Sequence, residues 1–258
     1  MARWTKFYLI HIEFLGFRYH GWQVQPGLKS VEGMINKTFS FILKHEGFKV
    51  LGCGRTDAKV SADDFAFELF LNEEIDPTLL LEQLNSNLPF DIRAKSVKEI
   101  DAKFNIIQHS KVKEYHYHFS FGKKTHPFNA PFMINFGEHL NIELMQEAVK
   151  EFVGTHNFRR YATKPSENTI FDREIINASI GRNTRFTGSS VPENAFVFKV
   201  SSKGFLRYQV RLMMAALIDV GNGTYTVEDI KNSLINFNED AMKHNAPSSG
   251  LNLHKVSF

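Results

Sequence analysis

The chain has 258 residues, 43% of them hydrophobic and 23% charged, and its formal net charge is +3. This composition excludes disordered, collagen-like and coiled-coil proteins, and the length suits one large domain or two smaller ones. The single cysteine, Cys53, excludes an intramolecular disulfide and a multi-thiolate zinc site, so we expect a reducing, cytoplasmic compartment. No segment approaches the ~18 apolar residues of a membrane span, so we expect no membrane partner.

The first half of the chain predicts the order strand, helix, strand, strand, helix, strand. Ser30 is a suitable N-cap for the first helix, and Asp76-Pro77 supplies a cap and a first-turn proline for the second. The sequence predicts strands at 6–14, 47–54, 64–71 and 91–99 and helices at 30–45 and 76–88. This order is the split βαββαβ arrangement of ferredoxin-like folds.

The second half repeats that order. Asn141 is expected to cap its first helix and Gly221 to end its second, whereas residues 122–137 are expected to be irregular because two prolines and two glycines interrupt them. The expected strands are 114–121, 173–181, 195–202 and 250–258, and the expected helices are 141–154, 205–221 and 226–237. We therefore expect an α+β protein with two ferredoxin-like domains, 1–106 and 107–258, whose mixed, mostly antiparallel sheets form a central cleft.

Short basic segments are interleaved with aromatic residues in the second half. They are Arg159-Arg160 with Lys164, residues 111–118, and Lys123-Lys124. Such segments suit phosphate contacts combined with base stacking, but they are more typical of solvated faces.

Asp57 is the first candidate for chemistry. It lies on the turn between two predicted strands in LGCGRTDAKVSA, residues 51–62, where rigid neighbours would aim its carboxylate as a nucleophile or base. The alternative is a turn-forming aspartate that accepts backbone N–H groups. The Gly-Cys-Gly triplet lacks the GKS or GKT ending and the strand–glycine–helix order of a phosphate loop, so we exclude that motif.

Arg211 is the second candidate, because it lies in an otherwise apolar predicted helix. Either its stem carries the guanidinium to solvent or a carboxylate meets it, and Arg207 is expected one turn earlier on the same face. Tyr115 and Tyr117 share one face of a predicted strand, as part of a packed sheet or as a stacking platform. Trp22, in HGWQVQP, belongs either to a structured loop or to an RNA contact. The 11 histidines show no helical pair with a nearby acid, so no metal site is expected.

Six segments together resemble one family. GRTDAKVSA is similar to the GRTDAGVHA signature of TruA-type tRNA pseudouridine synthases, and five further segments resemble that family's other motifs in the same order. They are GFRYHGWQVQP, NSNLPFDI, EYHYHF, GFLRYQVR and SSGLNL. The resemblance spans nearly the whole chain. It implies the pseudouridine synthase fold and a cofactor-free homodimer that isomerises uridine in the anticodon stem-loop of tRNA, at positions 38 to 40.

The resemblance also assigns roles to residues. Asp57 attacks C1′ or removes a sugar proton, Arg211 keeps that acid ionised, and Tyr115 stacks on the target base. Arg55 helps to flip the nucleotide out of its helix, and Leu251 forms an apolar wall. A paralogue acting on another RNA site and a non-catalytic RNA-binding protein are the alternatives; a glycoside hydrolase is weaker because no second carboxylate has a clear acid role.

Several residues depart from the family's motifs. Lys59 replaces the usual glycine, which suggests a positive φ at this position, and Ser61 replaces the usual histidine. Leu15 stands where the family has an aspartate, and Ile106-Ile107 stands where it has a basic residue. These departures fall around expected RNA contacts, whereas Asp57, Tyr115 and Arg211 match the family's motifs.

Overall fold

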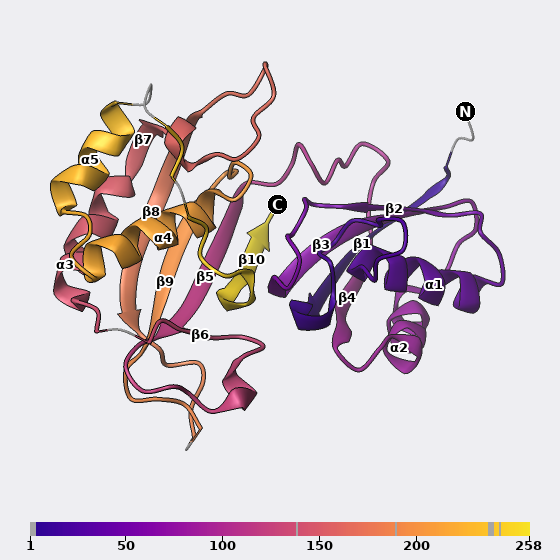
Figure 1. Ribbon diagram of the computed structural model, residues 1–258. Helices are drawn as coiled ribbons and strands as arrows, with labels where there is room; N and C mark the ends of the chain where they lie inside the picture. The colour runs from indigo at the N-terminus through magenta and orange to yellow at the C-terminus, as the bar shows by residue number, and fades with distance from the viewer. Residues whose placement is uncertain (1–3, 138, 189, 237–239, 243) are drawn as a thin grey trace. The chain divides into compact units, whose positions relative to one another are not determined.

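The computed structural model describes residues 4–137, 139–188, 190–236, 240–242 and 244–258 (Figure 1). The chain forms two compact units. The first unit contains Met1–Lys111 together with Leu253–Phe258, and the second contains Val112–Asn252. No helix in the described parts of the chain is both long enough and apolar enough to cross a membrane.

The first unit has the expected order of elements. Its sheet runs β4-β1-β3, with β2 also paired to β3, and all three pairs are antiparallel. Helices α1 and α2 pack against each other (Figure 1). The elements are β1 (Lys6–Phe14), the 3-10 helix η1 (Gly16–Arg18), α1 (Val31–Leu43), β2 (Lys49–Gly52), β3 (Ser61–Leu71), α2 (Pro77–Asn87) and β4 (Ile92–Glu99). The β1-α1-β2-β3-α2-β4 order and the α+β class are confirmed.

Alternating apolar residues of β1 and β3 form the core of this unit. On β3, the side chains of Phe65, Phe67, Leu69 and Leu71 are almost fully buried, as their two-residue period predicts. Ile10 of β1 is the register partner of Phe67. The two predicted N-caps are confirmed. Ser30 Oγ accepts a hydrogen bond from Gly33 N, and the Asp76 side chain accepts one from Thr78 N.

The second unit has the strand order β5-β9-β8-β7, with antiparallel pairs along this path, and β6 pairs with β5 in parallel. Its first strands and helices are β5 (Val112–Ser120), η2 (Pro127–Asn129), β6 (Ile134–Asn135), α3 (Ile142–Ala148), η3 (Val149–Phe152), β7 (Gly154–Asn157) and η4 (Arg159–Tyr161). They are followed by β8 (Asp172–Arg182), β9 (Ala195–Ser202), α4 (Gln209–Gly221), α5 (Val227–Ile235) and η5 (Ser248–Gly250). The last strand, β10 (Leu251–Ser257), starts in the second unit, and its residues from Leu253 onward belong to the first unit.

The second unit differs from expectation in two short strands, β6 and β7, and in several helix boundaries. Strand β6 lies within residues 122–137, which were expected to be irregular, so the second unit does not simply repeat the order of the first. Tyr208 is left-handed, with φ 65° and ψ 5°, so α4 begins at Gln209 and not at residue 205. The prediction that Arg207 lies one helical turn before Arg211 is therefore wrong, because Arg207 precedes the helix. Helix α3 tightens into η3 after Ala148, and α5 ends at Ile235. The expected end of that last helix, residue 237, lies outside the described residues.

Candidate active site

The loop that carries Asp57 is held against the loop that follows β1. Two glycines permit this close approach. A Cβ on Gly21 would lie 2.2 Å from the carbonyl oxygen of Thr56, and a Cβ on Gly16 would lie 1.9 Å from that of Val60. Gly21 also has a φ of +86°. Any larger side chain at either position would push the two loops apart.

Backbone hydrogen bonds fix the same loop. Trp22 N donates to Thr56 O at 3.3 Å, Val60 N donates to Asp57 O at 3.2 Å, and Lys59 N donates to Tyr19 O at 2.9 Å. The side chain of Asp57 is half-buried and that of Arg55 is exposed. Because the backbone on both sides of Asp57 is anchored by hydrogen bonds, the position from which its side chain extends is fixed.

Lys59 and Ser61, the two departures within this motif, both have structural roles. Lys59 adopts φ 67°, so the left-handed conformation suggested by the family's glycine is confirmed. Its ammonium lies 5.7 Å from the centroid of the Phe17 ring. Ser61 Oγ accepts a buried hydrogen bond of 2.9 Å from Gly16 N. Serine therefore satisfies a backbone donor that would otherwise be buried without a partner.

Trp22 belongs to the core of the first unit. Only 3% of its surface is exposed, and its ring stacks on Phe65 with centroids 4.2 Å apart. A Cβ on Gly52 would lie 2.6 Å from the Trp22 ring. Of the two readings of HGWQVQP, the structured loop is confirmed for Trp22.

In the second unit, Arg211 is tied to the segment before β10. Its Nε donates to Ala246 O at 2.8 Å, and Ala246 N donates to Arg211 O at 3.1 Å. Its guanidinium lies 4.8 Å from the Tyr208 ring centroid, and that of Arg207 lies 5.2 Å from the same ring. Arg211 is therefore held by a carbonyl and an aromatic face, and does not simply extend into solvent.

Tyr115 and Tyr117 have different environments on β5. Tyr115 is partly exposed and meets Phe205 edge-on, with centroids 5.3 Å apart. Tyr117 is fully buried, and its hydroxyl donates to Pro247 O at 2.7 Å. Burial raises the pKa of Tyr117, while the charge of Arg211 opposes the shift, so the phenol remains a hydrogen-bond donor. Tyr117 is structural, and Tyr115 is the tyrosine with accessible ring surface.

Leu251 begins β10 directly after η5, and only 6% of its surface is exposed. The preceding Gly250 is tightly packed, because a Cβ there would lie 2.9 Å from both the carbonyl oxygen of His118 and the ring of Tyr117. The segment from Ala246 to Leu251 therefore joins Arg211, Tyr117 and Leu251 within the second unit.

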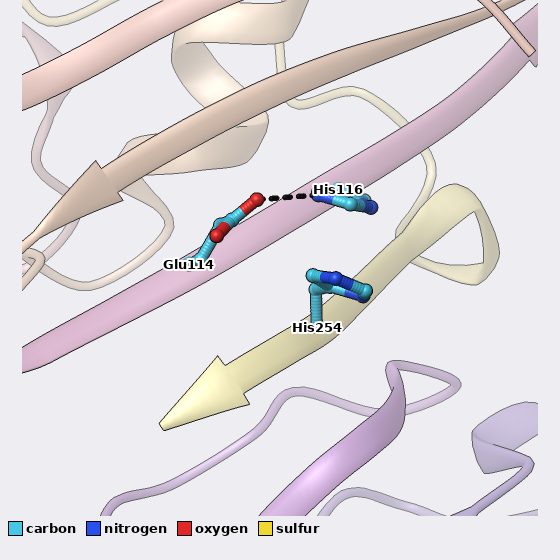
Figure 2. Close-up of side chains that lie close together, drawn as sticks. All are labelled: Glu114, His116 and His254. Carbon is cyan, nitrogen blue, oxygen red and sulfur yellow. Dashed lines mark hydrogen bonds and ion pairs between the residues drawn. The ribbon is translucent and has the colours of Figure 1, made fainter. Parts of the chain in front are cut away.

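Glu114 and His116 alternate with the tyrosines along β5 and bond to each other. His116 Nε2 and a Glu114 carboxylate oxygen are 2.7 Å apart, and the His116 side chain is nearly buried (Figure 2). His254, also drawn in Figure 2, bonds to Asp63 of its own unit at 3.0 Å.

Each unit thus assembles its own candidate residues. The first unit holds Asp57 and Arg55 on one anchored loop, and the second links Arg211 to Leu251 and places Tyr115 on β5. Sequence reasoning missed Tyr208, Gly250 and the carbonyl of Ala246. The left-handed backbone of Tyr208 has no sequence signal, whereas the glycine in SSGLNL was a signal for close packing.

Comparisons with known proteins identify the family. Residues 148–258 match the family model described as tRNA pseudouridine synthase. The protein named tRNA pseudouridine synthase A of Aquifex aeolicus is 32% identical over 96% of this chain and 98% of its own length. The protein of the same name from Limosilactobacillus fermentum is 31% identical over 97% of this chain and 95% of its own length.

Likeness over the whole length of both chains defines the class, which is that of the pseudouridine synthases, and these enzymes are isomerases. The chain belongs to the tRNA pseudouridine synthase family.

Proposed function

We propose that this protein isomerises uridine to pseudouridine in the anticodon stem-loop of tRNA, with Asp57 as the nucleophile or base. The observation that carries the proposal is the anchored loop of Asp57. Glycines at 16 and 21 and three backbone hydrogen bonds hold this acid while leaving its side chain half-exposed. The relatives named tRNA pseudouridine synthase A support tRNA as the substrate.

The reaction conserves every atom of the nucleotide. The bond between C1′ and N1 breaks, the uracil rotates, and a bond between C5 and C1′ forms as C5 loses a proton and N1 gains one. The carboxylate of Asp57 either attacks C1′ or removes a proton from the sugar. Both routes begin from the ionised form of the acid, so a nearby cation assists them by opposing the cost of desolvation.

The other site residues complete the proposal. Arg211 favours the ionised form of the acid, and its bond to Ala246 O holds the guanidinium in place. The accessible ring of Tyr115 stacks on the target base, Arg55 helps to flip the nucleotide, and Leu251 forms an apolar wall. In this proposal, domain 1–106 supplies the acid and domain 107–258 the tyrosine and arginine of a cytoplasmic homodimer.

The substitution Asp57→Asn tests the catalytic role. Turnover of unmodified tRNA should be lost, while tRNA affinity should stay within about tenfold, a change of ~1.4 kcal/mol. The measurement is the mapping of pseudouridine at every uridine, together with a binding titration. Asp101→Asn is the matched control, because Asp101 is also a turn aspartate and accepts from Lys103 N at 2.7 Å. Its turnover should be unchanged.

Three results would contradict the proposal. Loss of folding in Asp57→Asn would identify the acid as a structural turn residue. Binding of tRNA by the natural protein without any pseudouridine product would indicate a non-catalytic RNA-binding protein. Product at a uridine outside the anticodon stem-loop would identify a paralogue with another target.

A further inference from the structure

Three loops meet at one end of the sheet of the first unit. They contain residues 15–19, 57–61 and 89–91, which follow β1, precede β3 and precede β4. Leu15 N donates to Asp91 O at 2.9 Å, and Lys59 N donates to Tyr19 O at 2.9 Å. The loop of residues 15–19 is therefore joined by hydrogen bonds both to the loop that carries Asp57 and to the loop that precedes β4.

Two exposed phenylalanines project from these loops, each with a cation against its ring. Phe90 is 91% exposed, and the guanidinium of Arg18 lies 4.6 Å from its centroid. Phe17 is 40% exposed, and the ammonium of Lys59 lies 5.7 Å from its centroid. We call these four residues the stacking surface. Both rings lie outside the core, on loops that are joined by hydrogen bonds to one another or to the loop that carries Asp57.

The stacking surface is held in place before any ligand binds. Arg18 forms two hydrogen bonds to the Asp91 carboxylate, and Tyr19 donates its hydroxyl to the same carboxylate at 2.6 Å. The side chain of Asp91 is only 3% exposed. Burial opposes its ionisation, but the bonds from Arg18 and Tyr19 lower its pKa overall. The carboxylate is thus charged at neutral pH, and the guanidinium beneath Phe90 stays fixed.

The positive charge near this surface favours binding of a polyanion. Arg18 and Asp91 neutralise each other, while Lys59 and the exposed Arg55 add positive charge on the neighbouring loop. Two departures from the family's motifs act in the same direction, since Leu15 removes an acid and Lys59 adds a base. The lysine beside Phe17 is unsuited to the core of a protein interface, from which lysine is depleted.

We propose that the stacking surface binds unpaired nucleotides beside the target uridine of tRNA, which extends the function proposed above. Bases stack on Phe17 and Phe90, and Lys59 contacts a phosphate. Such contacts are largely insensitive to sequence because every base has a π face. The surface would hold the strand that flanks the flipped nucleotide, so it contributes affinity and position while Asp57 performs the chemistry.

The test compares steady-state kinetics of an unmodified tRNA transcript between matched variants. The double variant Phe17→Ser with Phe90→Ser should raise KM about thirtyfold or more, the scale expected when two base stacks are lost. It should leave kcat within about twofold because the acid is untouched. Phe90→Trp should retain the KM of the natural protein.

Phe41→Ser is the matched control. Phe41 is 59% exposed and has the Lys44 ammonium 4.0 Å from its ring centroid, but it lies on α1 and outside the three loops. Its KM should not change, which separates the stacking surface from exposed phenylalanines in general.

Lys59→Gly tests the phosphate contact through salt dependence. The slope of log affinity against log salt should fall by about one, as expected for one lost phosphate contact. Glycine adopts φ 67° without strain, so unfolding is not expected to weaken the binding. Phe90→Ser should weaken binding without changing this slope.

The outcomes separate this inference from the proposed function. If the natural protein forms no pseudouridine, the proposed function fails. The inference then fails as well, because there is no target uridine, even if the variants weaken tRNA binding. If it forms pseudouridine and the double variant has an unchanged KM, the inference alone fails. An unchanged KM with a lower mass in sedimentation would instead identify the surface as a contact with a second copy of this chain.

Discussion

Lys59 has a backbone conformation that L-residues adopt at a cost of roughly 1 kcal/mol. It retains this conformation, with φ 67°, because its N–H bonds to Tyr19 O and because Val60 N closes the turn on Asp57 O. Ser61 next to it satisfies Gly16 N. The residues at both departures from the family's motif thus support the loop that carries Asp57, and they change the charge and side-chain chemistry beside that acid.

Glu68 provides a test of buried charge in the same unit. It is 3% exposed on β3, and its carboxylate accepts from Ile106 N at 2.9 Å. Burial raises the pKa of Glu68, although Ile106 N–H and Lys49 oppose the shift. The ionised form therefore destabilises the folded state, and the contribution of Glu68 to stability should become more favourable as pH falls through its folded-state pKa toward 4.5.

The substitution Glu68→Gln keeps the acceptor for Ile106 N but removes the charge. We expect a higher free energy of unfolding at pH 7 than in the natural protein, and the difference should vanish once the pH is below 4.5, where both side chains are neutral. Urea titrations across this pH range measure the effect. Glu46→Gln, at an exposed position, is the control. If Glu68→Gln were less stable than the natural protein at neutral pH, the conclusion that the ionised Glu68 destabilises the fold would be wrong.

The candidate residues could be predicted from motifs, whereas their supports could not. Asp57 and Arg211 stood out because an acid on a turn and a cation in an apolar helix are conspicuous. The role of Ala246 was hidden, since it acts through a carbonyl that every residue has. Phe90 gave no sequence signal either, because exposure of an aromatic residue depends on which loops meet at the end of the sheet.

At the scale of elements, the regular strands and long helices were predictable because burial of one face imposes a period. The strand β7, with four residues, is too short to show a period, and the start of α4 depends on a left-handed residue. Helix α3 ends early because the chain tightens into η3. These boundaries depend on tertiary contacts, which local patterns do not encode.

The packing of η5 against β5 gives a prediction for one element contact. Gly250→Ala would place a Cβ 2.9 Å from the His118 carbonyl oxygen and the Tyr117 ring, so η5 must move. We expect a loss of about 1–3 kcal/mol of stability, and a lower kcat because the segment that binds Arg211 moves with it. Thermal unfolding and single-turnover kinetics measure the two effects.

Gly204→Ala is the matched control for this prediction. An added Cβ at Gly204 meets no atom within 4 Å, so stability and kcat should be nearly unchanged. If the two substitutions lowered stability and kcat equally, close packing at Gly250 would not be the cause of the loss.

At the scale of the whole molecule, the chain passes twice between the two units. It leaves the first unit after Lys111 and returns at Leu253, so the last six residues belong with the beginning of the chain. Lys111 N donates to Ser257 O at 2.8 Å, and His254 bonds to Asp63. The first unit therefore includes residues that are more than 140 positions away from the rest of it along the chain.

This dependence predicts that the C-terminal segment controls the stability of the first unit. Leu253 is 2% exposed, so Leu253→Ala should cost about 2–5 kcal/mol. Hydrogen exchange should rise mainly in the first unit, including β3, whose Asp63 and Asp64 bond to His254 and Val256 N. The exposed neighbour Lys255→Ala should leave exchange unchanged. If exchange instead rose only in the second unit, the last six residues would stabilise that unit and the division of the chain would be wrong.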